Sequence, residues 1–389
     1  MTLRARAATP LGALVDLLTP SRLGCLPVLA GLALALACAT VRDHPAHALR
    51  FNHDEMSAKV DEIFADFEAR GVPGASIAIF RGDDVLLAES RGVANREDGT
   101  PVTPDTNFRL ASVTKQFTAM SILLLRGRGQ LDLDDPIRKF FPNLPEIGDE
   151  ITIRHLLTHT SGIISYENLM PEDQVEQLKD RDVLALVQTQ HGTYFTPGTA
   201  YRYSNSGYAF LSLIVEEVSG LRYPDFLRVN IFEPLGMEGT VAFEEGRSTV
   251  PRRAMGYALS DGEVIPRDQS LTSAVLGDGG IYCSVMNYQK WDKALRTEQL
   301  VSDAVIEEAY TPVVLPDDTS TGYGFGWRVD ERDGVRIVHH NGGTCGFSTA
   351  VRRVPKVGLS IVVLTNLAQG DAPAAADALL DSMLTASAD

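Results

Sequence analysis

The chain has 389 residues, of which 44% are hydrophobic and 22% charged, and its formal net charge is −16. It shows no repeat period and no long low-complexity tract, which excludes repeat and disordered architectures and indicates a globular protein with a large core. The acidic balance repels phosphate backbones and anionic lipid headgroups, so it argues against nucleic-acid binding. Beyond residue 48 only Cys283 and Cys345 remain of the four cysteines, and two free thiols are favoured over a disulfide framework.

Residues 1–48 have the pattern of a targeting segment. Three arginines precede an apolar stretch over residues 23–39, which is short for a membrane span and is followed by small residues. The prediction is an exported protein, periplasmic or extracellular, and an uncleaved anchor helix is the alternative. Membrane contact is expected only through this segment.

The cleavage site of this segment has several candidates. Ala-x-Ala triplets end at Ala37, Ala39 and Ala48, and cleavage is expected after one of them. Ala35-Leu36-Ala37-Cys38 also resembles an imperfect lipoprotein box, in which Cys38 would carry the lipid. The sequence leaves soluble, lipid-anchored and helix-anchored forms open.

Strand patterns lie at both ends of the remaining chain. A helix is predicted from Ser57 to about Arg70, and the apolar runs Ala75–Phe80 and Val85–Ser90 predict a hairpin. Near the other end, short β-rich runs precede a last helix, and they are Phe325–Val329, Val335–His340, Phe347–Val354 and Leu359–Thr365, with the helix over about Pro373–Thr385.

Between these ends the patterns are mostly helical, and they cover Val113–Arg126, Ile153–Thr158, Asp182–Gln188 and Tyr208–Val218. The prediction is therefore an α/β (α+β) fold over residues 49–388. One antiparallel sheet, built from about 55–95 and 320–388, would be flanked by helices, and about 100–320 would form an inserted helical domain.

Several familiar catalytic motifs are absent. The chain has no Gly-x-Ser-x-Gly elbow, no Walker loop and no dinucleotide fingerprint after a strand. His155 and His159 are four residues apart on a predicted helix, but the glutamate of a zinc protease is missing between them, so a structural role is favoured. Asp132, Asp134 and Asp135 lack the glycine and distal glutamate of a calcium loop and indicate a turn.

Ser112-Val113-Thr114-Lys115 remains as a candidate catalytic motif. Only seven lysines occur, and no other lies three residues after a serine. A serine at a helix start presents its N–H and the helix dipole to a reacting carbonyl. A lysine three positions on shares its face, and partial burial favours the neutral amine that accepts a proton. Taken alone, an ordinary helix start with a solvated lysine is the simpler interpretation.

A second segment strengthens the catalytic interpretation. Tyr203-Ser204-Asn205 offers a phenol and an amide that face the same point if the backbone is extended. Tyr166-Glu167-Asn168 has the same spacing, but Phe195-Thr196-Pro197-Gly198 before the first segment and a helix near Gly207 after it favour Tyr203. A tyrosine held between two cations is able to act as a base.

A third segment, His339-His340-Asn341-Gly342-Gly343, ends a predicted strand. Gly342 and Gly343 would let a substrate lie against the strand edge and leave a free N–H for an oxyanion hole. His340 is the candidate side chain of this segment, and a structural histidine packed under the strand is the alternative.

In order and spacing, these segments resemble the class C β-lactamase-related serine hydrolases: Ser-x-x-Lys, then Tyr-x-Asn, then Lys/His-x-Gly. That family includes AmpC-type β-lactamases, D-alanyl-D-alanine carboxypeptidases, D-aminopeptidases and esterases. Other stretches also resemble the sequence motifs of this family, and they are Leu156–Gly162, Phe195–Gly207, Pro234–Met237 and Tyr323–Trp327. The resemblance covers about residues 55–385.

The resemblance implies a β-lactamase/transpeptidase-like fold and a set of roles. Ser112 would form an acyl-enzyme that water hydrolyses, while Lys115 and Tyr203 would move the proton, and which of them takes the serine proton stays open. Asn205 would bond the substrate amide or Lys115, and the N–H groups of Ser112 and Gly343 would bind the oxyanion. The implied partner is a small-molecule or peptide substrate, and no metal or organic cofactor is implied.

One departure bears on the substrate. β-Lactamases of this class usually carry lysine at the position of His340, and lysine presents a fixed charge to a substrate carboxylate. Histidine near neutral pH is only partly charged, so a D-amino-acid peptide or a small ester is favoured over a β-lactam. A true β-lactamase and a non-catalytic receptor of cell-wall peptides or penicillins are the alternatives.

Overall fold

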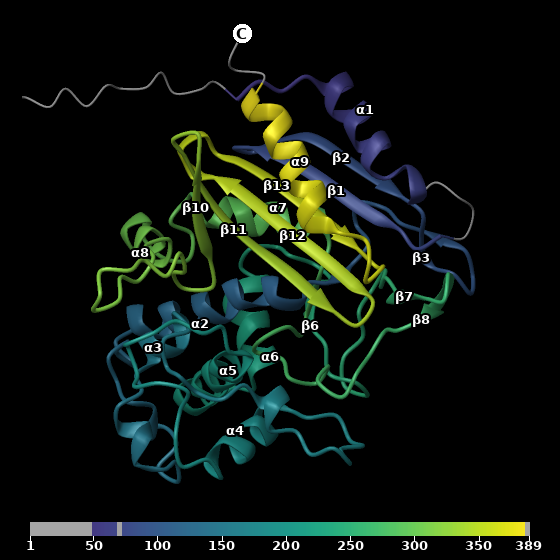
Figure 1. The fold of residues 1–389 in the computed structure, drawn as a ribbon. Coiled ribbons are helices and arrows are strands. Elements are labelled where there is room, and N and C mark those ends of the chain that lie inside the picture. Colours follow the sequence, from purple (N-terminus) through teal and green to yellow (C-terminus); the bar gives the residue numbers. More distant parts are fainter. Residues whose placement is uncertain (1–48, 68–71, 386–389) are drawn as a thin grey trace, which may run out of the picture. The chain divides into compact units, whose positions relative to one another are not determined.

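A computed structural model describes residues 49–67 and 72–385 (Figure 1). The predicted targeting segment, with its three candidate cleavage positions and Cys38, lies outside the described residues, as does the end of the predicted first helix. Within the described ranges, no helix combines the length and hydrophobicity needed to cross a membrane. Cys283 and Cys345 are both free thiols, the first buried and the second half-buried.

Both ends of the chain contribute to one antiparallel sheet, with strand order β10-β11-β12-β13-β1-β2 (Figure 1). Its strands are β1 (Ala75–Arg81), β2 (Asp84–Arg91), β10 (Arg328–Arg332), β11 (Val335–Thr344), β12 (Phe347–Val354) and β13 (Leu359–Thr365). The ends meet where β1 pairs with β13, Ala75 opposite Thr365. The predicted sheet is confirmed except for the Phe325–Val329 run, because Gly326 turns the chain at φ +78° and β10 begins only at Arg328.

The helices are α1 (His53–Ile63), α2 (Lys115–Gly127), α3 (Ile153–Leu157), α4 (Asp180–Gln188), α5 (Asn205–Ser219), α6 (Tyr223–Leu227), α7 (Val285–Ala294), α8 (Asp303–Ala309) and α9 (Ala372–Thr385). Most of the helices correspond to predicted ones with shifted bounds, but α6, α7 and α8 were not predicted. Beyond its last turn α1 is followed by a 3-10 turn at Ala65–Phe67. Helices α1 and α9 cover one face of the sheet and α7 lies on the other (Figure 1).

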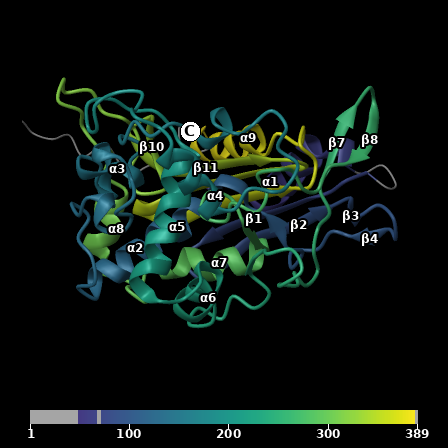
Figure 2. The same cartoon turned by 90° about the horizontal axis from the view of Figure 1, so that it is seen from below.

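The segment between about 100 and 320 holds helices α2 to α8, long connecting loops and several short strands. These and the small strand before them are β3 (Val93–Asn95), β4 (Thr100–Pro101), β5 (Phe108–Arg109), β6 (Val241–Ala242), β7 (Tyr257–Ser260), β8 (Glu263–Pro266) and β9 (Ile281–Cys283). Strands β5, β9 and β6 form a small sheet, and β7 with β8 forms a hairpin that projects in Figure 2.

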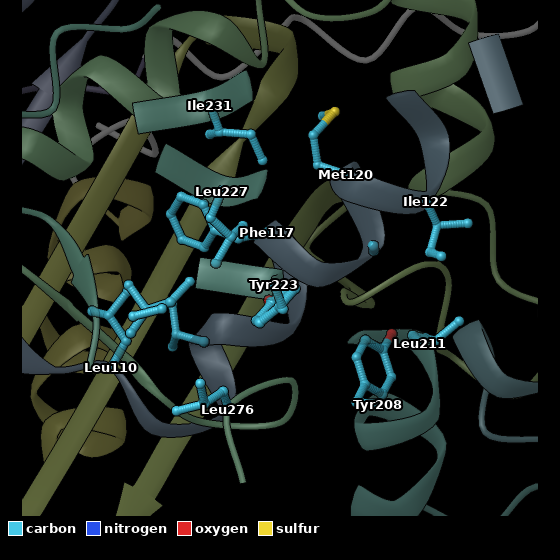
Figure 3. Packing of buried hydrophobic residues seen from close by; sticks show 14 of the residues in the cluster. Leu110, Phe117, Met120, Ile122, Tyr208, Leu211, Tyr223, Leu227, Ile231 and Leu276 are labelled. Atoms are coloured by element: carbon cyan, nitrogen blue, oxygen red, sulfur yellow. The ribbon is translucent and has the colours of Figure 1, made fainter. Parts of the chain in front are cut away.

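Helix α2 lies in the main core. All its residues from Lys115 to Leu125 are buried. Figure 3 shows Phe117 of α2 beside Leu227 and Tyr223 of α6. The same ring stacks on Trp291 of α7, with ring centroids 4.2 Å apart. Because packing on several sides fixes α2, its first turn holds its side chains in a defined position.

A buried ion pair joins α7 to the central sheet. Arg353 of β12 donates from Nε to Asp292 Oδ1 at 2.7 Å, and the two side chains are 2% and 0% exposed. Removing the carboxylate leaves a buried guanidinium unpaired, so we expect Asp292→Ala to lower the free energy of unfolding by about 3–5 kcal/mol. Chemical denaturation measures this loss.

The same helix offers a control pair. Asp83 pairs with Lys293 at 2.8 Å and with Arg296 at 3.1 Å, and its side chain is 61% exposed, so Asp83→Ala should cost much less stability than Asp292→Ala. Equal losses in the two variants would contradict the argument from burial.

Candidate active site

The first turn of α2 brings Ser112 and Lys115 together. Ser112 is half-buried and lies in a 3-10 turn, Ala111–Thr114, that runs directly into α2. Lys115 is fully buried, and its Nζ donates to Ser112 Oγ at 3.1 Å. Ala111 has a φ of +49°, and a left-handed conformation costs a residue with a side chain about 1–3 kcal/mol. The serine thus follows a strained bend, as functional residues often do.

The Lys115 amine has two further partners. Its Nζ donates to Asn205 Oδ1 at 2.9 Å and to the backbone oxygen of Asp278 at 2.8 Å. Both oxygens only accept, so they fix two N–H groups of the amine in either protonation state. The third position faces Ser112 Oγ, where an ammonium places its last N–H and a neutral amine places its lone pair. In the neutral form, Lys115 is therefore oriented to accept the serine proton.

Two glycines allow other segments to pack closely against the backbones of α2 and α5. Gly326 precedes β10, and a Cβ built there would lie 2.7 Å from the backbone oxygen of Lys115. Gly277 lies beside α5, and its Cβ would come within 2.3 Å of the backbone oxygen of Tyr208. Any larger residue would push these segments away, so both positions require glycine.

Tyr203 lies next to Lys115, whose Nζ is 5.0 Å from the centre of the tyrosine ring. Ser204 is extended, with φ −139° and ψ 121°, and Asn205 is the first residue of α5. This is the backbone that the sequence requires for Tyr203 and Asn205 to face one point. The Tyr203 hydroxyl is buried and has no hydrogen-bond partner among the described residues.

His159 supports Tyr203 from behind. The two rings are 4.2 Å apart between centroids, and His159 Nδ1 accepts the N–H of Ser204 at 3.2 Å. Burial and the nearby Lys115 charge hold the pKa of His159 well below its usual range, so its ring is neutral. His155 instead accepts the N–H of its own helix cap, and the described residues hold no cluster of three or more metal-ligating side chains.

His340 on β11 is buried, with 2% of its surface exposed. Its Nδ1 lies 2.7 Å from the carbonyl oxygen of Asn341, which only accepts, so Nδ1 donates and Nε2 accepts from the Tyr323 hydroxyl at 2.9 Å. Burial and the charge of Lys115 hold the pKa of His340 well below its usual range. The ring is therefore neutral, and both of its nitrogens are occupied before any substrate binds.

Gly342 and Gly343 lie on β11, opposite Thr349 and Ser348 of β12. A Cβ on Gly342 would lie 2.3 Å from the backbone oxygen of Leu110, just before the serine turn, whereas the space around Gly343 is open. Gly342 thus lets β11 pack against the serine turn. The oxyanion role of Gly343 stays a prediction.

The structure adds two charged side chains that the sequence did not identify. Arg328 begins β10, and its guanidinium carbon lies 5.9 Å from the Tyr203 ring centre and 5.7 Å from that of Tyr323. No carboxylate of the described residues forms an ion pair with it. Glu167, from the second Tyr-x-Asn segment, accepts from Asn205 Nδ2 at 2.6 Å. Arg328 directly follows the Tyr323–Trp327 motif, a signal that would have located it.

An antiparallel sheet flanked by helices, with Ser-x-x-Lys at the start of buried helix α2 and Tyr-x-Asn at the start of α5, is the arrangement of a β-lactamase-related serine hydrolase. Comparison with known families agrees, because the family described as Beta-lactamase matches residues 60–383. The chain belongs to this family.

Individual relatives give the same picture. Penicillin-binding protein 4* of Bacillus subtilis (strain 168) is 33% identical over 300 residues, or 73% of this chain and 66% of that protein. D-aminopeptidase of Gluconobacter oxydans (strain 621H) is 28% identical over 320 residues, or 80% of this chain and 59% of that protein. The chain thus spans less than two thirds of the length of both curated relatives.

A solved structure confirms the predicted fold. D-amino acid amidase from Ochrobactrum anthropi SV3, in complex with L-phenylalanine amide, superposes with a TM-score of 0.71 at 26% identity. The superposition covers 86% of this chain and 100% of the amidase chain. The likeness extends over both the sheet and the helical part of the described residues.

Proposed function

We propose that this protein is an exported serine hydrolase that cleaves an amide or ester of a D-amino acid through an acyl-enzyme on Ser112. The observation that carries the proposal is the Lys115 amine, fixed by Asn205 Oδ1 and the Asp278 backbone oxygen and directed at Ser112 Oγ. The likeness to a D-aminopeptidase and to a D-amino acid amidase supports the substrate class. The leader pattern in residues 1–48 supports export.

In the proposed reaction, the Ser112 proton passes to neutral Lys115 as Oγ bonds to the substrate carbonyl carbon. The carbonyl electron pair moves to oxygen, and the N–H groups of Ser112 and Gly343 stabilise that charge by about 3–4 kcal/mol if typical. The C–N or C–O bond then breaks, and Tyr203 supplies the proton of an amine leaving group. In the second half, water attacks the acyl carbon and gives its proton to the Tyr203 phenolate. Lys115 returns its proton to Ser112 Oγ as the acid leaves, which restores the starting state.

The charges near Tyr203 and Asn205 suit a substrate with a free ammonium group and, when it is a peptide, a carboxylate. His340 is neutral, so it presents no cation of the kind a lysine would place on this strand. Arg328 supplies a fixed positive charge near Tyr203, and Glu167 supplies a carboxylate next to Asn205. A D-amino-acid amide or peptide carries a free ammonium and, when it is a peptide, a carboxylate that these side chains complement.

The test uses the mature protein recovered from the exported fraction. We expect D-phenylalanine p-nitroanilide to be cleaved at least about 100-fold faster, in kcat/KM, than its L-enantiomer. Intact-mass measurement should give a chain that begins beyond the leader, and a rapid quench with a p-nitrophenyl ester should add one acyl group at Ser112. A folded protein with no turnover and no adduct, with these probes or a penicillin, would overturn the proposal in favour of a receptor. A chain that retains Met1 in the cytosol would contradict export.

A further inference from the structure

Asp278 carries a buried carboxyl group that the proposed reaction does not use. Asp278 is 7% exposed, and its backbone oxygen is one of the acceptors that hold Lys115. Its carboxyl Oδ2 accepts from the hydroxyl of Tyr166 at 3.0 Å. Asp278 therefore contacts the amine through its backbone and places a titratable group in the same buried region.

The loop that carries Asp278 is fixed on both sides. Asp180 of α4 accepts the backbone N–H of Leu276 at 2.9 Å and that of Gly277 at 3.0 Å. On the other side, Thr118 of α2 donates from Oγ1 to the Gly277 oxygen at 2.6 Å. The carboxyl of Asp278 is thus held inside the protein and cannot reach water by a small loop movement.

The charged and titratable groups that face Asp278 come from four elements. They are Lys115 of α2, Tyr166 and Glu167 of the 3-10 turn Tyr166–Asn168, Asp180 of α4 and Tyr223 of α6. Burial raises the pKa of Asp278 to about 7, opposed by Lys115 and reinforced by Asp180 and Glu167. Burial also raises the pKa of Asp180 to about 6. The carboxyl therefore changes charge close to neutral pH, with the Lys115 amine as its cationic neighbour.

We propose that the charge of the buried Asp278 carboxyl controls the Lys115 amine, and so sets how readily Lys115 acts as the base. An ionised Asp278 stabilises the ammonium form of Lys115, and a neutral Asp278 does not. The inference rests on the proposed function, because it assigns Lys115 the serine proton. Asp278 is a positioning residue in this scheme, since it acts on Ser112 only through Lys115.

The sign of the effect follows from the charge. Asp278→Asn removes the negative charge but keeps an oxygen that accepts from Tyr166. Without the carboxylate, the ammonium form of Lys115 loses a stabilising negative charge, so the acid limb of kcat/KM against pH should move down by about one pH unit. Tyr166→Phe removes a hydrogen bond that favours the charged carboxyl, so it should move the limb in the same direction by less.

The experiment compares wild type, Asp278→Asn and Tyr166→Phe with D-phenylalanine p-nitroanilide between pH 5 and 10. Tyr288→Phe is the matched control, because this buried hydroxyl donates to Gln116 at 2.6 Å and makes no hydrogen bond to Asp278 or Lys115. The midpoint of its acid limb, in kcat/KM against pH, should coincide with that of wild type. Should Asp278→Asn not fold, Tyr166→Phe carries the test. An unmoved midpoint in the folded variants overturns the inference.

Thermal unfolding gives a readout that needs no turnover. The folded pKa of Asp278 lies above the unfolded value of 3.8, so its contribution to stability is complete below about pH 4 and is lost as the pH rises to about 7. Relative to wild type, Asp278→Asn should gain about 2 °C or more in Tm between pH 5 and pH 8. A constant difference overturns the inference even if the enzyme is active. Wild type could show no turnover while the Tm difference between Asp278→Asn and wild type still changes with pH. That result would reject the proposed function, and the link between Asp278 and catalysis would be rejected with it.

Discussion

Ser112→Ala is expected to lower kcat by on the order of 10⁴-fold or more, with the fold unchanged. Ser112 Oγ is the atom that would bond to the substrate carbonyl, and no other serine of the chain lies three residues before a lysine. When the hydroxyl is removed, Lys115 Nζ loses one hydrogen bond but keeps its bonds to Asn205 Oδ1 and the Asp278 backbone oxygen. The variant should therefore keep its melting temperature while losing turnover and the acyl adduct.

Ser76→Ala provides the control for this substitution. Ser76 is a buried serine of β1 whose Oγ lies 3.1 Å from Ser90 Oγ, within the central sheet. This variant loses a hydroxyl that is more deeply buried than that of Ser112 and that does not touch the serine turn, so its turnover should match wild type within about a factor of two or three. If Ser112→Ala retained more than about a tenth of wild-type turnover, another group would be the nucleophile and the proposed reaction would be wrong.

The sheet was predictable because its strands carry their own signals. The β1–β2 hairpin has apolar runs on both sides of a Gly-Asp turn, and β12 and β13 have the bounds that their β-rich runs indicate. The pairing of β1 with β13 followed only from placing both groups of strands in one sheet. Which strands pair depends on contacts between residues about 290 positions apart, and no local pattern specifies them. The shift at β10 was missed because Gly326 needs its positive φ to let the chain pass Lys115, a contact that no local pattern encodes.

The candidate site was predictable where its residues lie in short motifs. Ser112 and Lys115 share one turn, and Asn205 was found from its spacing to Tyr203. The Asp278 oxygen was not found, because a backbone acceptor has no residue signature and its loop reaches α2 through tertiary packing. His340 was predicted as the site residue of its segment. Tertiary burial occupies both of its ring nitrogens, which its sequence context does not show.

The second large effect concerns which group takes the Ser112 proton, a question that the sequence leaves open. Lys115 Nζ is within hydrogen-bond distance of Ser112 Oγ, whereas the Tyr203 hydroxyl has no partner among the described residues. We therefore expect Lys115 to act on the serine and Tyr203 on the leaving group. A general base contributes about 10²–10⁴-fold, so Lys115→Met should lower acylation by that factor for both an ester and an anilide. Circular dichroism and Tm establish that the variant is folded.

Tyr203→Phe should separate the two substrates. p-Nitrophenolate leaves an ester without a proton, but the amine of a p-nitroanilide needs one as the C–N bond breaks. We expect Tyr203→Phe to lower kcat/KM by about 10²–10⁴-fold for D-phenylalanine p-nitroanilide and by less than about tenfold for the corresponding p-nitrophenyl ester. Equal large losses with both substrates would assign Tyr203 to the attack of Ser112. Lys115 would then act through Tyr203, and the coupling of Asp278 to the reaction would run through the phenol as well.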